Sequence, residues 1–286
     1  MGLYPQPNNW QCGPFALKHG LIMLGRIVDE KKISRIAGAH WWNGADDIKL
    51  GHAARAYDCE LKLIRRKSAL RAKRELLLAL RKGYPALLCV DQWNHWITVV
   101  GAERNKFVLI DSRRAPVVQI ATWSTLRRRW GFRQKDHDDP TQTETLFDLH
   151  PVIPKFHVRT KAHFSLKNAR YLRRAENRQF ATHWDEYFTD LSSICTPRTP
   201  RSQNVLSLGE LLRRHQAMIC SQIAFWHGSV NPDRVARMLR NFRFVAETYD
   251  LVVRQDEEKR AMTAITALLS LWAASKFGIG TVYGNI

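Results

Sequence analysis

The chain has 286 residues, a formal net charge of +19, and a composition that is 45% hydrophobic and 10% aromatic. This composition excludes general disorder, and the length is sufficient for two domains. No signal-peptide pattern opens the chain and the apolar run at 264–274 is too short to cross a membrane, so we expect a cytoplasmic protein. The five cysteines lack CxxC or metal-ligand spacing, which predicts reduced thiols and no metal or organic cofactor.

The strongest chemical signal lies at the start of the chain. Gln6 stands six positions before Cys12, and the apolar run 15–25 predicts a helix that ends at a glycine. At the start of a helix, a cysteine thiolate is favoured by backbone N–H groups and by the helix dipole. The Gln6 amide would supply an N–H to a developing oxyanion. Cys12 could equally be a buried structural cysteine, which is common. This segment alone therefore favours neither a nucleophilic nor a structural role for Cys12.

Three short apolar segments, at 86–90, 96–101 and 106–110, predict neighbouring antiparallel strands. His95 stands at the start of the second strand, and Asp111 directly follows the third. A short turn between these two strands would bring both side chains to the same edge of a sheet. The carboxylate would fix the tautomer of the imidazole and stabilise its cation.

Together these motifs resemble the papain-like cysteine peptidases, and within them the peptidase C39 group, over roughly residues 1 to 135. The residues that carry the resemblance are Gln6, Gln11-Cys12-Gly13-Pro14, Asn94-His95-Trp96 and Ile110-Asp111-Ser112. It implies an α+β domain in which the helix of the nucleophile packs on an antiparallel sheet. The resemblance also implies a further helix near residues 44–58, between the helix of the nucleophile and the sheet.

The resemblance implies a role for each residue of the candidate catalytic set. Cys12 would be the nucleophile, His95 the general acid and base, Asp111 the orienting acid and Gln6 the oxyanion donor. Gln11 departs from the shorter residue that many members have before the cysteine, and it is a second choice for the oxyanion role. Transporter-linked members cut leader peptides after a Gly-Gly pair and are fused to membrane spans. Leader removal is not implied for this chain, which lacks such spans.

Five residues near this set are candidate substrate contacts: Gln11, Gly13, Trp93, Asn94 and Trp96. The two tryptophans flank His95 and would wall a cleft, although aromatic residues in strands usually belong to the core. His40 and His52 are interpreted as packing or surface residues, because no partner stands at metal-ligand spacing. The aspartate-rich residues 136–140 are interpreted as a turn.

The second half of the chain changes to a helical pattern. We expect a peptidase domain at 1–150, a connecting helical and linker region at 151–205, and an all-α helical bundle at 206–286. Within the bundle, caps and prolines predict helices at 207–226, 232–254 and 256–276. The segment 195–203, interrupted twice by proline, is interpreted as an exposed linker. We expect the bundle to bind a protein partner or to form a homo-oligomer.

Basic residues are spread over both halves of the chain. Arg234, Arg237, Arg240 and Arg243 recur every third position, which predicts a basic stripe on a helix. Such a stripe is usually a solvated face, so nucleic-acid binding is the minority interpretation.

The function that we predict is cleavage of a peptide or isopeptide bond in a peptide or protein substrate, by a Cys-His-Asp triad. Two alternatives remain open. One is an acyltransferase or amide-forming enzyme on the same fold. The other is a basic, non-catalytic adaptor that binds nucleic acid or an acidic protein.

Overall fold

A computed structural model describes residues 2–135, 141–227 and 230–277. The predicted turn at 136–140, Gly228 at the expected end of a helix, and residues 278–286 lie outside the described part. The chain divides into two compact units, Met1–Asp185 and Glu186–Ile286. The boundary falls near the start of helix α8 (Trp184–Ile194).

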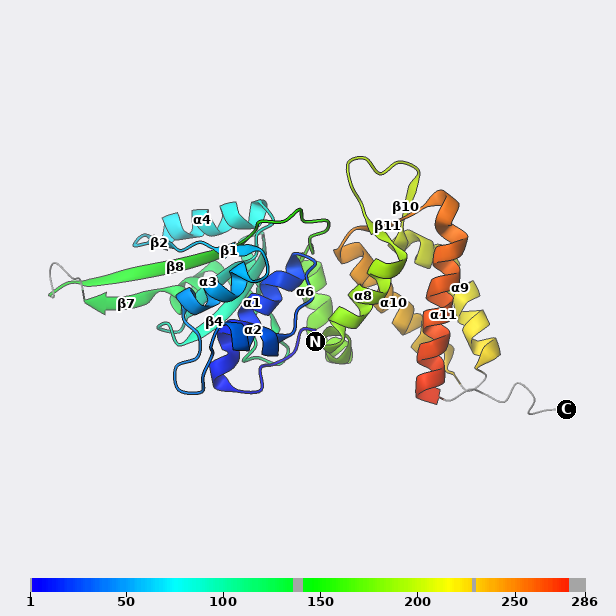
Figure 1. The fold of residues 1–286 in the computed structure, drawn as a ribbon, viewed down its shortest axis with the longest axis horizontal. Helices are drawn as coiled ribbons and strands as arrows, with labels where there is room; N and C mark the ends of the chain where they lie inside the picture. Colours follow the sequence, from blue (N-terminus) through cyan, green and yellow to red (C-terminus); the bar gives the residue numbers. More distant parts are fainter. Residues whose placement is uncertain (1, 136–140, 228–229, 278–286) are drawn as a thin grey trace. The chain divides into compact units, whose positions relative to one another are not determined.

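The first unit is built on an antiparallel sheet (Figure 1). Its strands are β1 (Cys59–Leu61), β2 (Ile64–Arg66), β3 (Ala86–Val90), β4 (His95–Glu103), β5 (Lys106–Ile110), β6 (Val118–Thr122), β7 (Phe132–Lys135) and β8 (Thr143–Pro154). The main order is β1-β8-β3-β4-β5-β6, and β2 and β7 also pair with β8. The three strands predicted from apolar segments are confirmed as β3, β4 and β5.

Helices cover both faces of this sheet (Figure 1). One face carries α1 (Cys12–Met23), α2 (Glu30–Ile36) and α3 (Asp47–Arg55), and the other carries α4 (Ala69–Arg81) and α5 (Trp123–Trp130). The alternation of side chains along β3 explains the two cores, because Leu87 and Cys89 face α1 whereas Leu88 and Val90 face α4. The helix that begins at Cys12 therefore packs on an antiparallel sheet, as predicted.

Helix α1 is enclosed on every side. All twelve of its residues are buried, because its sequence is apolar nearly all round. The main exception is Lys18, whose ammonium donates to Glu30 Oε2 at 3.0 Å. The other oxygen of Glu30 accepts the hydroxyl of Tyr4 at 2.6 Å. The charge inside the core is thus neutralised within a small network that also joins α1 to α2.

The hairpin of β4 and β5 brings its two outer ends together. Its tight turn is formed by Arg104 and Asn105, both with left-handed backbone angles typical of two-residue hairpin turns. A bulge between Val99 and Gly101 shifts the register by one residue along the hairpin. After β8, the chain continues through α6 (Leu166–Arg173) and α7 (Arg178–Thr182) to the end of the first unit.

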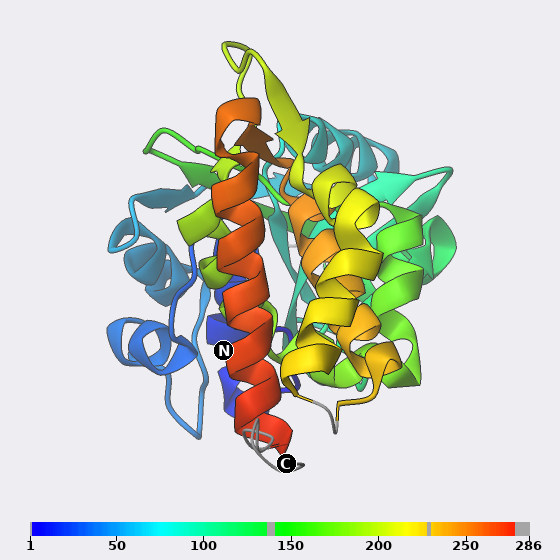
Figure 2. The same cartoon turned by 90° about the vertical axis from the view of Figure 1, so that its right-hand side faces the viewer.

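The second unit is mainly helical, as predicted. Helices α9 (Leu208–Trp226), α10 (Pro232–Thr248) and α11 (Glu258–Phe277) form the bundle shown in Figure 2. The stripe predicted on α10 is outward-facing at Arg234, Arg237 and Arg240. None of the helices in the described ranges is long and apolar enough to cross a bilayer.

A small sheet inside this unit corrects two details of the prediction. It consists of β9 (Thr196–Pro197), β10 (Val205–Ser207) and β11 (Leu251–Arg254), in the order β10-β11-β9. Helix α10 therefore ends at Thr248 and does not reach Arg254, because the buried, β-branched run of β11 pairs with strands on both sides. The segment 195–203, predicted to be an exposed linker, is mostly exposed but contributes β9 to this sheet.

Candidate active site

Cys12 occupies the first position of α1, and its side chain lies at the wall of a cleft. The residue is only 8% exposed. Burial would raise the pKa of the thiol, but interactions with His95 and with the backbone N–H of Trp96 outweigh burial and lower it. Cys12 stands at the helix start that the sequence predicts, but the interactions that lower its pKa come from His95 and from Trp96 in β4, not from the N–H groups of the helix.

His95 and Asp111 meet at the edge of the sheet, as the hairpin predicts. His95 Nε2 lies 2.7 Å from Asp111 Oδ1, and both residues are completely buried. Nδ1 of His95 is buried and has no hydrogen bond of ordinary length within the described ranges. Because the Cys12 thiol nevertheless raises the pKa of His95, this nitrogen is the one left to the thiol. The imidazole therefore lies between a carboxylate and a thiol.

The pKa values of the pair favour a charged state. Burial lowers the pKa of His95, but hydrogen bonding and charge from Asp111, followed by Cys12, raise it overall. Burial raises the pKa of Asp111, but the hydrogen bond and charge of His95, followed by the charge of Arg129, lower it to about 2. Asp111 is thus ionised at neutral pH and stabilises an imidazolium next to it.

Arg129 is a positioning residue that the sequence did not single out. Its Nη1 donates to Asp111 Oδ2 at 3.0 Å, while Nε and Nη2 donate to the two oxygens of Asp91 at 3.0 and 2.8 Å. The backbone N–H of Arg113 donates to the other oxygen of Asp111 at 3.1 Å. Both oxygens of the buried carboxylate are therefore held from outside the triad.

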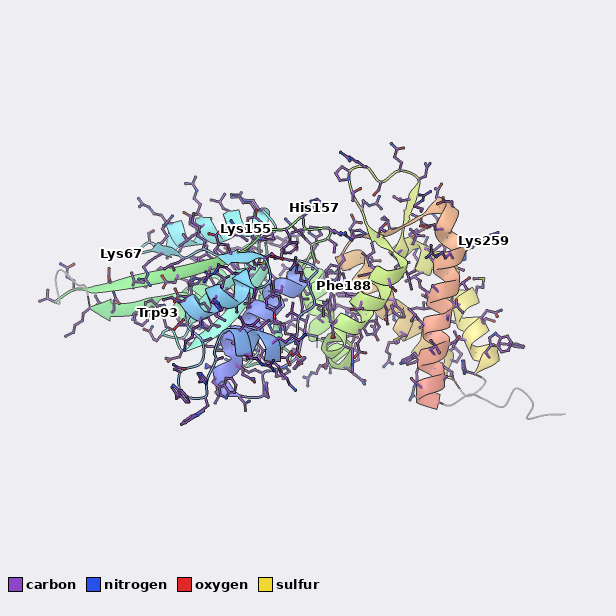
Figure 3. The ribbon with its side chains drawn as sticks, in the orientation of Figure 1. Lys67, Trp93, Lys155, His157, Phe188 and Lys259 are labelled. Atoms are coloured by element: carbon purple, nitrogen blue, oxygen red, sulfur yellow. The ribbon has the colours of Figure 1, made fainter. Side chains whose placement is uncertain are left out.

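The turn before His95 has an unusual backbone. Asp91, Gln92 and Trp93 are consecutive non-glycine residues with φ of 56°, 58° and 58°. Such conformations cost free energy and persist only where the surroundings hold them. Here the Gln92 amide bonds the backbone on both sides of Phe132, and the Trp93 ring stacks on Phe132 at 3.7 Å between centroids. Trp93 lies beside β7 in Figure 3.

The two candidate oxyanion donors belong to the segment before Cys12. Gln6 forms two hydrogen bonds with Ser112. The backbone N–H of Gln6 donates to the carbonyl of Ser112 at 2.9 Å, and the amide oxygen of Gln6 accepts the hydroxyl of Ser112 at 2.5 Å. One N–H of the Gln6 amide donates to Asn8 O at 2.7 Å. Gln11 is buried, and its amide oxygen lies 3.4 Å from Asn8 Nδ2. Gln6 is therefore anchored beside Asp111, and a second N–H remains on its amide.

The cleft at Cys12 has a volume of about 590 Å³. Three of the five candidate substrate contacts line it, namely Trp93, Asn94 and Trp96. Gln11 is not among the residues that line it. Nor is Gly13, which packs against α3, where an added Cβ would lie 3.1 Å from a Leu50 methyl.

The sequence did not predict the other residues that line the cleft, most of which come from segments far from Cys12 and His95 in the chain. They are Asn9, Trp10, Trp41, Trp42, Asn43, Gly44, Ala45, Asp46, Asp47, Arg65, Cys89, Asp148 and His150. His40 stacks on Trp42 with parallel rings 4.7 Å apart, in keeping with a packing role.

Within the described ranges, no group of three or more His, Cys, Asp or Glu side chains is placed to hold a metal ion. Each of the five cysteines is a free thiol.

Three solved structures resemble about half of the chain. The peptidase domain of Streptococcus ComA, a bi-functional ABC transporter involved in quorum sensing, shares 16% identity over 54% of this chain and 98% of its own length, with a TM-score of 0.39. A double glycine motif protease from an AMS/PCAT transporter, in complex with the leader peptide, shares 17% identity over 52% of this chain and 90% of its own length, with a TM-score of 0.38.

The third is the peptidase domain of Streptococcus mutans ComA, with 15% identity over 52% of this chain and 98% of its own length and a TM-score of 0.30. No protein-family model matches the chain, and no curated protein sequence matches it. At such identities the similarity is one of fold. The three domains are peptidases or proteases by name.

Proposed function

We propose that this protein is a cysteine peptidase that cleaves a peptide or isopeptide bond through Cys12, His95 and Asp111. The observation that supports this most strongly is a buried imidazole that lies 2.7 Å from a buried carboxylate and whose charge and hydrogen bonding also lower the pKa of the thiol at the start of α1. Cys12 also opens onto a cleft, so a substrate carbonyl has access to the sulfur. An activated thiol, a base and an orienting group are the parts that nucleophilic catalysis needs.

In the proposed reaction, the Cys12 thiolate attacks the carbonyl carbon and a covalent acyl-enzyme forms. His95, as the imidazolium, protonates the leaving amine, and then removes a proton from the water that releases the acyl group. Asp111 remains ionised throughout and holds the tautomer of His95. The oxyanion receives hydrogen bonds from the backbone N–H of Cys12 and the amide of Gln6, with Gln11 as the second choice for the side-chain donor.

The reaction needs a reduced Cys12 and no cofactor. All five cysteines are free thiols in the structure, and this fits a reducing compartment such as the cytoplasm. The substrate in this proposal is a peptide or a protein, since the triad acts on acyl groups. The helical bundle of the second unit is proposed to bind a protein partner or a second copy of the chain.

The test is intact-mass analysis after treatment with a mild peptide-like electrophile between pH 5 and 8, with peptide mapping of the modified cysteine. We expect rapid single labelling at Cys12 that persists at low pH and disappears in His95→Ala. His52→Ala is the matched control, because His52 is exposed and lies outside the cleft. Slow labelling spread over several cysteines, including the half-buried Cys220, would contradict the proposal.

Two further measurements separate the alternatives. If, with an acyl substrate that turns over, an added amine captures the acyl group faster than water does, the protein is an acyltransferase on the same fold. If Cys12 is not labelled selectively while binding to an acidic partner falls steeply with added salt, the basic adaptor is the better description.

A further inference from the structure

The cleft at Cys12 has a charge opposite to that of the whole chain. The chain has a formal net charge of +19, yet the cleft is lined by Asp46, Asp47 and Asp148 with Arg65 as its single basic group among the described residues, apart from a histidine. Arg65 is already neutralised by Asp148, in a two-pronged ion pair at 2.7 and 2.6 Å. The remaining charge on the wall of the cleft is therefore negative.

Asp47 is the carboxylate available to a ligand. Asp46 caps helix α3, because its Oδ1 accepts the backbone N–H of Lys49 at 2.8 Å. Asp47 follows it in the first turn, is half-buried, and forms no side-chain hydrogen bond or ion pair with any described residue. Its charge acts on Arg65 and on His150, so it lies near both.

His150 supplies an independent sign that a ligand belongs here. The residue is 3% exposed and lines the cleft, and within the described ranges its imidazole forms no hydrogen bond. Burial lowers its pKa, so the ring is neutral at physiological pH and one nitrogen is an acceptor. Its ring nitrogens are not sealed in the core but reach the solvent of the cleft, so a ligand that enters the cleft has access to them. A donor group on a ligand, such as an ammonium or a guanidinium, would satisfy this nitrogen.

Two exposed tryptophans complete the wall. Trp41 and Trp42 are 75% and 63% exposed, and they lie on a turn closed by two backbone hydrogen bonds between His40 and Gly44. Exposed indoles next to each other are unusual on a surface that has no binding role. The face of an indole attracts ammonium and guanidinium groups more strongly than other aromatic rings do.

We propose that this cleft binds a lysine or arginine side chain of the substrate, close to the bond that Cys12 cleaves. The cation would lie against the indoles of Trp41 and Trp42 and pair with Asp47, while His150 accepts one of its hydrogen bonds. This inference rests on the proposed function, because it names the substrate class of the same site. The basic surface elsewhere repels such a substrate, so that electrostatics favours the cleft over the rest of the molecule.

The test uses matched peptidyl vinyl sulfones that alkylate Cys12. Each set carries lysine, norleucine or Nε-acetyl-lysine at one position near the electrophile, so that the chain length is kept while the charge is removed. The second-order rate constant of Cys12 labelling is measured on the full chain by intact mass. We expect the lysine probe to react about tenfold faster than either neutral probe at one position, which is the order expected from an exposed cation–π contact together with an ion pair.

Variants then assign this preference to the cleft. Asp47→Asn and Trp42→Ala should each remove most of the preference for lysine, and Asp58→Asn, an exposed aspartate outside the cleft, should keep it. Equal rates for charged and neutral probes at every position, or a preference that survives both cleft variants, would overturn the inference. Iodoacetamide labelling, measured in parallel, distinguishes failure of this inference from failure of the proposed function. If Cys12 reactivity depends on His95 but the vinyl sulfone probes show no charge preference, only the inference about the substrate cation fails. Cys12 reactivity that is independent of His95 removes the proposed function.

Discussion

Replacing Arg129 by methionine tests how the triad is held together. Its guanidinium joins the completely buried Asp111 to Asp91, whose side chain is 39% exposed. The variant keeps the length of the side chain and removes three charge-assisted hydrogen bonds. The buried carboxylate of Asp111 then loses one of its partners, and the turn that carries His95 loses its side-chain link to α5, while the backbone hydrogen bond from Asp91 N–H to Arg129 O, at 2.7 Å, remains.

The expected loss of stability follows from these contacts. Leaving the buried Asp111 partly uncompensated costs about 2–3 kcal/mol, whereas the more exposed Asp91 pair adds at most about 1 kcal/mol. A total of about 3 kcal/mol lowers the melting temperature of a unit of this size by roughly 6–12 °C. The pKa of Asp111 rises from about 2, because a nearby positive charge is removed.

The assay combines thermal denaturation with the rate of Cys12 alkylation by iodoacetamide at pH 6. Arg129→Met should lower both the melting temperature and the alkylation rate, the latter by roughly tenfold to a hundredfold, as expected when a catalytic group is misplaced. Arg129→Lys should lie between, because lysine keeps the charge but not the planar fork. Arg128→Met removes an exposed arginine of the same helix. If the two methionine variants behave alike, Arg129 does not position Asp111.

Three further outcomes are expected. The pKa of Cys12 is lowered from 9.0, so alkylation of Cys12 should persist well below pH 9 and stop only when falling pH protonates the thiolate. The pKa of His95 is raised from 6.5, so hydrolysis should also decline when rising pH deprotonates His95. An alkylation midpoint near pH 9 would contradict this. Glu30→Gln leaves the lysine buried in α1 without its anion and should cost about 3 kcal/mol in urea unfolding; an unchanged midpoint would show that the lysine is already neutral. Gly101→Ala should lower the free energy of unfolding by about 2 kcal/mol, because its Cβ would overlap a backbone carbonyl oxygen. Gly51→Ala meets no close atom and should stabilise α3 by about 0.5–1 kcal/mol. Similar effects at both glycines would refute the steric argument.

The triad was accessible to sequence analysis because its members are placed by local patterns. Cys12 opens an apolar helix, His95 starts an apolar strand and Asp111 ends the next one, so that hairpin geometry alone brings the last two together. Arg129 was not accessible. It stands at the end of three consecutive arginines, and which of them faces Asp111 depends on how α5 packs on the sheet.

The cleft was harder to predict than the triad for a related reason. Its walls combine the turn that carries Trp41 and Trp42 with β8 residues such as His150, more than a hundred positions away. No local periodicity relates segments at such a separation. The small sheet of the second unit was missed because the buried residues of β11 closely follow a helix, and an apolar run of three residues fits either a helix or a strand.

The enclosure of α1 has a consequence for how this protein can change. A substitution in that helix disturbs the core, so the element that carries Cys12 is under strong constraint. The turn from His40 to Gly44 is the opposite case, since its tryptophans are exposed and two backbone hydrogen bonds close its base. On the proposed function, exchange of the five residues of this turn should alter substrate preference without disturbing the helix that carries Cys12. A library randomised over this turn is accordingly a compact starting point for directed evolution of new specificities.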